Sequence, residues 1–97
     1  MRLTFEWHEQ KAAENVRKHN VSFEEAKTAF NDPFLITLAD QNHAETESRY
    51  ISIGTSSAGR VLVIVHTERE KNIRLISCRR ATPSERRVYE EGSAWPV

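Results

Sequence analysis

The longest apolar run in the chain lies at residues 61–65, and a second apolar segment follows after a short polar break. Val61–Val65 consists only of β-branched and aliphatic residues, which is typical of a strand buried on both faces. Residues 68–71 are all charged, and the segment from Ile73 to Arg80 is again rich in strand formers. The pattern predicts a β-hairpin with its tip at residues 68–71, beginning at Arg60 and ending at Arg80.

Helical spacing of apolar residues appears twice near the N-terminus. Residues 9–18 contain strong helix formers with Ala12, Ala13 and Val16 on one side, and Asn20 can adopt the left-handed conformation that ends many helices. Ser22 followed by Glu25 is the pattern of a capping box. A second helix is therefore predicted from Phe23 to about residue 30, before the break at residues 31–33.

The remaining elements complete a two-layer pattern. Strands are expected at residues 34–38 and 48–53, a polar loop at residues 40–47, and a short strand at residues 3–5. Thr82, Pro83 and Glu85 mark the start of a third helix, which Gly92 ends. We predict an α+β fold in which two N-terminal helices and a C-terminal helix pack on a four-stranded antiparallel sheet. Residues 1–92 form one domain and residues 93–97 a C-terminal tail.

Charge changes this picture because it is unevenly distributed. The 97-residue chain has no net charge, yet residues 1–59 carry three more acidic than basic side chains and residues 60–89 carry five more basic than acidic ones. Such a division favours an anionic partner for the hairpin and the last helix, although chance also produces it.

Several classes of function are disfavoured by composition. No apolar run approaches the roughly 20 residues of a membrane span, and no signal peptide is evident, so no membrane partner is expected. The single cysteine, Cys78, is expected to be a buried reduced thiol, in keeping with a cytoplasmic protein. The four histidines are scattered without metal-ligand spacing and the glycines are isolated. Neither a metal nor a cofactor is expected.

The remaining candidate chemistry is RNA cleavage. The arginines at positions 74, 79, 80, 86 and 87 would converge if the last helix folded back beside the last strand, and arginine binds phosphate bidentately. His66 ends the central strand and titrates near neutrality, which suits proton transfer. One hairpin register places His66 opposite Arg74 and another places it opposite Ile73; the sequence does not choose between them.

Each of these residues also has a purely structural interpretation. A histidine at a strand end is commonly a hydrogen-bonded edge residue, and Arg79 and Arg80 have Glu85, Glu90 and Glu91 as possible ion-pair partners. Arginines on a helix are commonly solvated, and Tyr89 has the position of a core anchor for the last helix. Spacing alone indicates no more than a basic α+β domain, for which nucleic acid is one candidate partner.

Longer motifs resemble one known family. Three segments near the N-terminus are similar to the opening of BrnT toxins: Phe5-Glu6-Trp7, Lys11 to Asn15 and Arg17 to Ala26. Further segments match the family in the order in which they occur there: Asp32-Pro33, Arg49-Tyr50, Ile53-Gly54, Val63 to Arg69, Ile73 to Ala81 and Glu85 to Tyr89. The resemblance covers residues 3–92. Two positions depart from the family pattern: His8 replaces an acidic residue, and Asn20 replaces a glycine at the helix end.

The resemblance implies a fold like that of RelE and ParE toxins. It further implies a type II toxin that cleaves RNA and halts translation, a BrnA antitoxin that neutralises it and represses the operon by binding DNA, and a toxin dimer within that complex. The family's recurring polar positions match His66, Thr67, Arg69, Arg74, Ser77, Arg79, Arg80 and Tyr89.

Two functional hypotheses follow. In the first, a metal-independent endoribonuclease leaves 2′,3′-cyclic phosphate ends, with His66, Arg74, Arg79, Arg80 and Tyr89 in catalysis and Arg69, Lys71, Arg86 and Arg87 binding RNA. In the second, the domain is a non-enzymatic toxin or an RNA- or protein-binding module of the same fold. The second is kept because the sequence shows no unambiguous acid–base pair.

Overall fold

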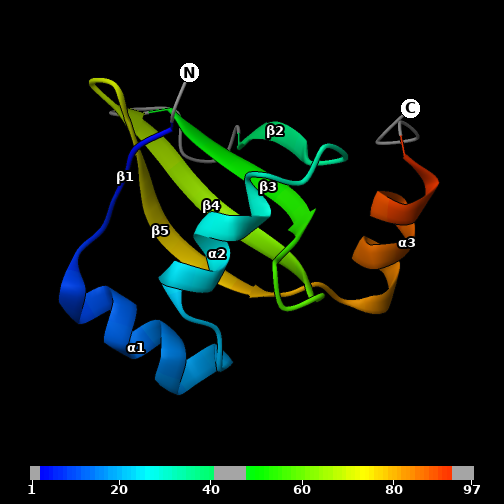
Figure 1. The fold of residues 1–97 in the computed structure, drawn as a ribbon, viewed down its shortest axis with the longest axis horizontal. Helices are drawn as coiled ribbons and strands as arrows, with labels where there is room; N and C mark the ends of the chain where they lie inside the picture. Colours follow the sequence, from blue (N-terminus) through cyan, green and yellow to red (C-terminus); the bar gives the residue numbers. More distant parts are fainter. Residues whose placement is uncertain (1–2, 41–47, 93–97) are drawn as a thin grey trace.

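The computed structural model describes residues 3–40 and 48–92, which fold as a five-stranded sheet with three helices (Figure 1). In chain order the elements are β1 (Phe5–Glu6), α1 (Glu9–His19), α2 (Phe23–Ala29), β2 (Ile36–Asp40), β3 (Arg49–Thr55), β4 (Val61–Arg69), β5 (Asn72–Arg80) and α3 (Pro83–Glu91). The strand order is β1-β5-β4-β3-β2. The α+β class and the three helices are as predicted.

The four-stranded antiparallel sheet was wrong, because β1 adds a fifth strand that runs parallel to β5. Phe5 lies opposite Ile73, whose N–H donates to the Thr4 carbonyl at 2.9 Å. The Phe5 ring packs edge-on against Phe30 at 5.2 Å between centroids. This pairing joins segments almost seventy residues apart, so a local pattern could not reveal it.

The core lies between the sheet and the two N-terminal helices. Val21, Phe23 and Ala26 from the helical layer pack against Leu62, Ile64, Leu75 and Cys78 of β4 and β5. We call this side of the sheet the inner face and the opposite side the outer face. Because side chains alternate along β4, residues 62, 64 and 66 point inward and residues 61, 63, 65 and 67 point outward.

The predicted helix ends are confirmed. Asn20 ends α1 with a φ of 57°, and the Ser22 hydroxyl accepts from the N–H of Glu25 at 3.0 Å. Thr82 and Glu85 form the complete capping box of α3, which ends before Gly92. At α2 the box is half-made, because the Glu25 carboxylate binds Arg60 instead of returning to Ser22.

The hairpin register differs from both predictions. The turn comprises only Glu70 and Lys71, so that Arg69 lies opposite Asn72, and His66 lies opposite Leu75 rather than Arg74 or Ile73. A β-bulge interrupts the ladder between Val65 and His66. Both predicted registers were wrong because the turn is centred between Glu70 and Lys71, further along the chain than either register assumed. The bulge lies beyond His66 and shifts only the pairing from Val65 onward.

No helix within residues 3–40 and 48–92 is long and apolar enough to cross a membrane. Most of the predicted polar loop and the whole predicted tail, residues 93–97, lie outside the described residues.

Candidate functional site

The bulge leaves Ile76 of β5 without a partner on β4, and this extra residue places Arg74 and Arg79 on the same face of the sheet. They are five residues apart, which on a regular strand would put them on opposite faces. Arg74 lies opposite Thr67 and Arg79 opposite Val63, two outer-face positions of β4. At about 3.3 Å per residue the two arginines lie roughly 15 Å apart along the strand, too far to hold a single phosphate.

Each of these arginines has a carboxylate partner. Arg74 donates to Glu6 on β1 at 2.9 Å. Arg79 donates through both terminal nitrogens to Glu85 on α3, each at 2.8 Å. The hydrogen bonds from Arg79 lower the pKa of Glu85 to about 2, so this carboxylate is a poor proton acceptor. Glu85 also belongs to the capping box, and therefore one residue both starts α3 and orients Arg79.

The other predicted cations fall into two separate groups. Arg69 and Lys71 are exposed at the hairpin tip, which is the end of the hairpin nearer to Arg74. Arg80 and Arg86 are exposed at the opposite end, where β5 leads into α3, and line a common pocket; Arg87 is exposed on the same helix. The structure therefore does not bring the five arginines to one point.

His66 lies on the inner face, away from both Arg74 and Arg79. It is 5% exposed, between the rings of Phe30 and Tyr50 at centroid distances of 5.1 and 5.7 Å. Its Nε2 and the Ser52 hydroxyl are 2.7 Å apart, and Nδ1 is buried without a hydrogen-bond partner. Burial lowers the pKa of His66 to about 4, so it is neutral at pH 7.

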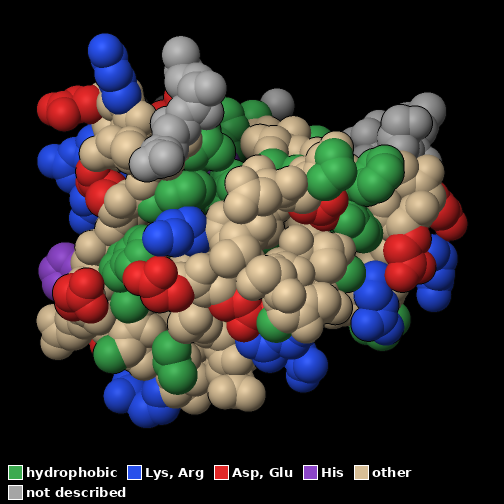
Figure 2. Space-filling view, viewed as in Figure 1, with side chains coloured by type: hydrophobic (Ala, Val, Ile, Leu, Met, Phe, Trp, Pro, Cys, Tyr) green, Lys and Arg blue, Asp and Glu red, His purple; other side chains and the backbone are tan. Residues whose placement is uncertain are grey.

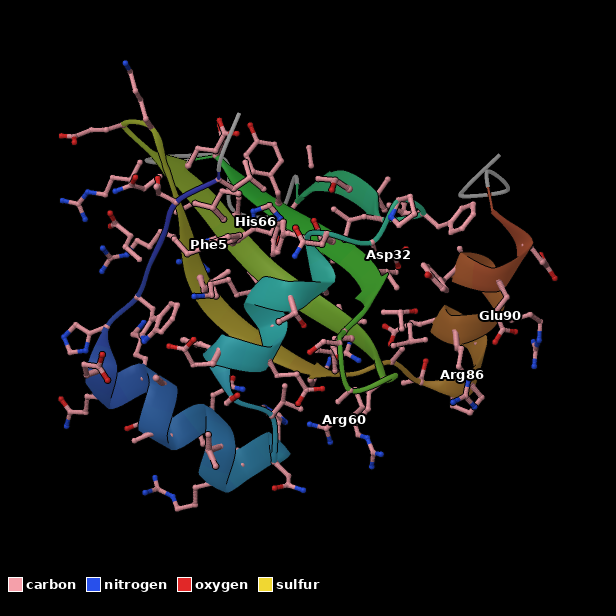
Figure 3. The ribbon with its side chains drawn as sticks, viewed as in Figure 1. Phe5, Asp32, Arg60, His66, Arg86 and Glu90 are labelled. Carbon is pink, nitrogen blue, oxygen red and sulfur yellow. The ribbon has the colours of Figure 1, made fainter. Side chains whose placement is uncertain are left out.

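Tyr89 attaches α3 to the rest of the molecule. Its hydroxyl accepts from the Thr55 hydroxyl at 2.9 Å and donates to the Asp32 carboxylate. Burial, together with the bond to Asp32, raises the pKa of Tyr89, so the phenol keeps its proton. Asp32 lies opposite α3 in Figure 3. Burial acts to raise the pKa of Asp32, but its bonds from Tyr89, Thr55 and Phe34 outweigh burial and lower it.

Sequence reasoning missed Arg60, Glu25 and Asn15. Arg60 opened the apolar hairpin but received no role, and Glu25 was assigned only to a cap. Asn15 is buried in α1, where its amide donates to the Val21 and Cys78 carbonyls at 2.9 and 2.8 Å and accepts from the Cys78 N–H at 3.1 Å. The sequence did contain a signal for Asn15, because it is a polar residue on the side of an amphipathic helix that packs against the sheet.

No group of three or more His, Cys, Asp or Glu side chains able to hold a metal ion occurs in the described part of the chain.

A family model described as the ribonuclease toxin BrnT of type II toxin–antitoxin systems matches residues 7–85. The chain belongs to the BrnT family. The prediction of a ribonuclease toxin of a type II system is thereby confirmed. Arg86, Arg87 and Tyr89 lie beyond the matched residues, and the match assigns no role to any individual residue.

A solved BrnT protein has the same fold. The 1.1 Å crystal structure of the Brucella abortus ribonuclease toxin BrnT superposes with a TM-score of 0.65 and 17% sequence identity. The alignment covers 84% of this chain and 99% of that one. At this identity the likeness establishes the fold alone. A search of curated proteins found no match.

Proposed function

We propose that this BrnT-family ribonuclease cleaves RNA without a metal ion, on the outer face where β5 leads into α3. The observation that carries the proposal is the Arg79–Glu85 pair. Glu85 holds both terminal nitrogens of Arg79 at 2.8 Å, while the Arg79 side chain remains 42% exposed. A guanidinium that is already oriented stabilises developing negative charge without reorganising during the reaction.

The reaction we propose is a transesterification. The RNA 2′-oxygen loses its proton and bonds to the adjacent phosphorus, the bond from phosphorus to the 5′-oxygen breaks, and that oxygen takes up a proton. Arg79 stabilises the pentacovalent phosphate, and Arg74 binds a phosphate further along the outer face. The products are a 2′,3′-cyclic phosphate and a 5′-hydroxyl.

Tyr89 is the proton donor in this proposal. Its raised pKa keeps the phenol protonated, and Asp32 and Thr55 fix the position of its oxygen. In the reaction the O–H breaks its hydrogen bond to Asp32 and gives its proton to the 5′-oxygen. His66 is left out of the reacting group, because it is buried on the opposite face of the sheet. The 2′-proton leaves to solvent water.

The partner we propose is a BrnA-like antitoxin that covers the outer face around Arg74 and Arg79, with DNA contacted only through the antitoxin and with two toxin copies in the complex. An antitoxin that blocks cleavage must exclude RNA from Arg79. A complex in which both arginines stay accessible would contradict this arrangement.

The order of helices and antiparallel strands also supports the RelE/ParE-like grouping.

The test is cleavage of a single-stranded RNA by the purified chain in EDTA, with the 3′ ends of the products analysed. We expect cyclic phosphate ends and no cleavage where the target nucleotide is 2′-deoxy. Arg79→Ala and Tyr89→Phe should each lower kcat by about 10²-fold or more. Arg17→Ala removes an exposed arginine from α1 and serves as the matched control.

Two results would refute the mechanism. One is cleavage of the 2′-deoxy substrate, because it lacks the nucleophile. The other is wild-type turnover by Arg79→Ala. A His66→Gln variant that folds should retain activity, which separates this proposal from a histidine mechanism.

A further inference from the structure

The two arginines that end β5 leave the sheet on opposite sides. Arg79 points to the outer face, whereas Arg80 lies opposite Leu62, a residue of the inner core. Arg80 is nevertheless exposed, because it lies at the end of the strand. Its guanidinium therefore does not share the outer-face site with Arg79, and its surroundings need a separate explanation.

Arg80 lines a pocket of about 410 Å³ together with Gly59, Arg60, Val61, Ala81 and Arg86. The Ala81 N–H donates to the Val61 carbonyl at 2.9 Å. This bond joins the first residue of β4 to the segment between β5 and α3. Figure 3 shows Arg60 and Arg86 at this end of the molecule, and Figure 2 shows basic side chains gathered along the same edge.

The pocket has more positive than negative charge. Arg60 is held by Glu25, through Nε at 2.9 Å and through Nη2, and also donates to the Asn20 carbonyl at 3.2 Å. Arg80 and Arg86 have no carboxylate within ion-pair distance among residues 3–40 and 48–92. Glu25 therefore neutralises Arg60, and Arg80 and Arg86 are the two guanidiniums of the pocket available to an anion.

We propose that this pocket, lined by Arg60, Arg80 and Arg86, binds an RNA phosphate that flanks the cleaved bond. Paired guanidiniums match the geometry of a phosphate, and arginine keeps its charge at any physiological pH. This inference rests on the proposed function, because the phosphate bound here belongs to the RNA that is cleaved at Arg79. Arg80 lies one residue beyond Arg79, on the other side of the sheet. An RNA strand that passes around the end of β5 reaches both sites, and Arg80 then acts in binding rather than in catalysis.

Binding is measured with the full chain and a 2′-O-methyl oligoribonucleotide, which lacks the free 2′-hydroxyl needed for cleavage. Fluorescence anisotropy over a range of salt concentrations gives Kd and the slope of log K against log salt. We expect Arg80→Gln and Arg86→Gln each to weaken binding about tenfold. Each should also reduce the magnitude of the slope by about 0.7, the value for one lost contact with a single-stranded phosphate. Arg17→Gln, which removes an exposed arginine on α1, should keep the wild-type slope.

Wild-type affinity and slope in the Arg80→Gln/Arg86→Gln double variant would overturn the proposal. Unchanged RNA binding with lost antitoxin binding would also overturn it, because the pocket would then serve an acidic protein segment. Cleavage assays separate the two proposals. If the slope falls as expected but no cyclic phosphate forms, the phosphate site is supported and the mechanism at Arg79 fails.

Discussion

Polar side chains occupy both faces of the sheet, and the two faces use them differently. On the inner face Asn15, Ser52 and His66 are each at most 5% exposed and hydrogen-bonded to neighbouring groups, with the buried His66 Nδ1 as the exception. On the outer face Arg74 and Arg79 keep about a third or more of their side chains exposed and pair with carboxylates that remain partly in water. Burial explains the difference, because an unsatisfied polar group costs far more in the core than at the surface.

The inner-face polar residues hold the fold, whereas the outer-face arginines are the residues proposed to contact RNA. Replacement of an inner-face polar residue should lower stability, whereas replacement of an outer-face arginine should lower binding or turnover and leave most of the stability. A histidine or arginine of a ribonuclease is therefore not a candidate for catalysis by residue type alone.

The largest effect is expected at Asn15. Its side chain pairs with both backbone groups of Cys78 and with the Val21 carbonyl, and Asn15→Ala leaves these three groups buried without that partner. We expect a loss of about 3 kcal/mol in the free energy of unfolding. Urea denaturation measures it, with Gln10→Ala, an exposed position on α1, as the control. A loss below about 1 kcal/mol would show that the inner face tolerates unpaired backbone groups.

Acid should destabilise the protein through His66. Its pKa is about 4 in the folded state against 6.5 in its reference state, so the unfolded chain binds the extra proton. Stability should fall by about 3 kcal/mol as pH drops from 6.5 to 4, and His66→Gln should flatten that decline. Urea midpoints between pH 7 and pH 4.5 test it above the range in which Glu85 titrates. An unchanged decline in the variant would assign the effect to other groups.

Glu85→Gln tests the outer face with a smaller effect on stability. Glutamine can still close the capping box of α3 but cannot form an ion pair with Arg79. Because this pair is partly exposed, we expect a loss of about 1 kcal/mol or less in thermal or urea unfolding. The kcat for RNA cleavage should fall by a larger factor, because Arg79 loses its orientation. If the loss in free energy of unfolding equalled the rise in activation free energy calculated from kcat, the distinction between the two faces would not hold.

The smallest effect is expected at the hairpin tip. Glu70 has a φ of 57°, a conformation that glycine adopts at lower cost than residues with a side chain. Glu70→Gly should raise stability by about 0.5 kcal/mol and leave RNA cleavage unchanged. Glu68→Gly, at an exposed strand position of β4, should instead lower stability and serves as the matched control.

Elements set by neighbouring residues could be predicted closely. Ser22 and Thr82 cap their helices, Asn20 ends α1 in the left-handed conformation, and the core of the Val61–Val65 run is buried. Each depends on contacts within four or five residues or on local apolar periodicity. The candidate site was predicted less well, because Arg60 and Glu25 meet only across 35 positions of the chain.

By itself the sequence determined the helices, the hairpin, the basic second half and the BrnT family. Tertiary structure decided that β1 joins the sheet, that the bulge places Arg74 and Arg79 on one face, and that His66 points into the core. The physical reason is that strand register and side-chain direction depend on pairing between distant segments. A shift of one residue turns a side chain from one face to the other, and no local preference records that choice.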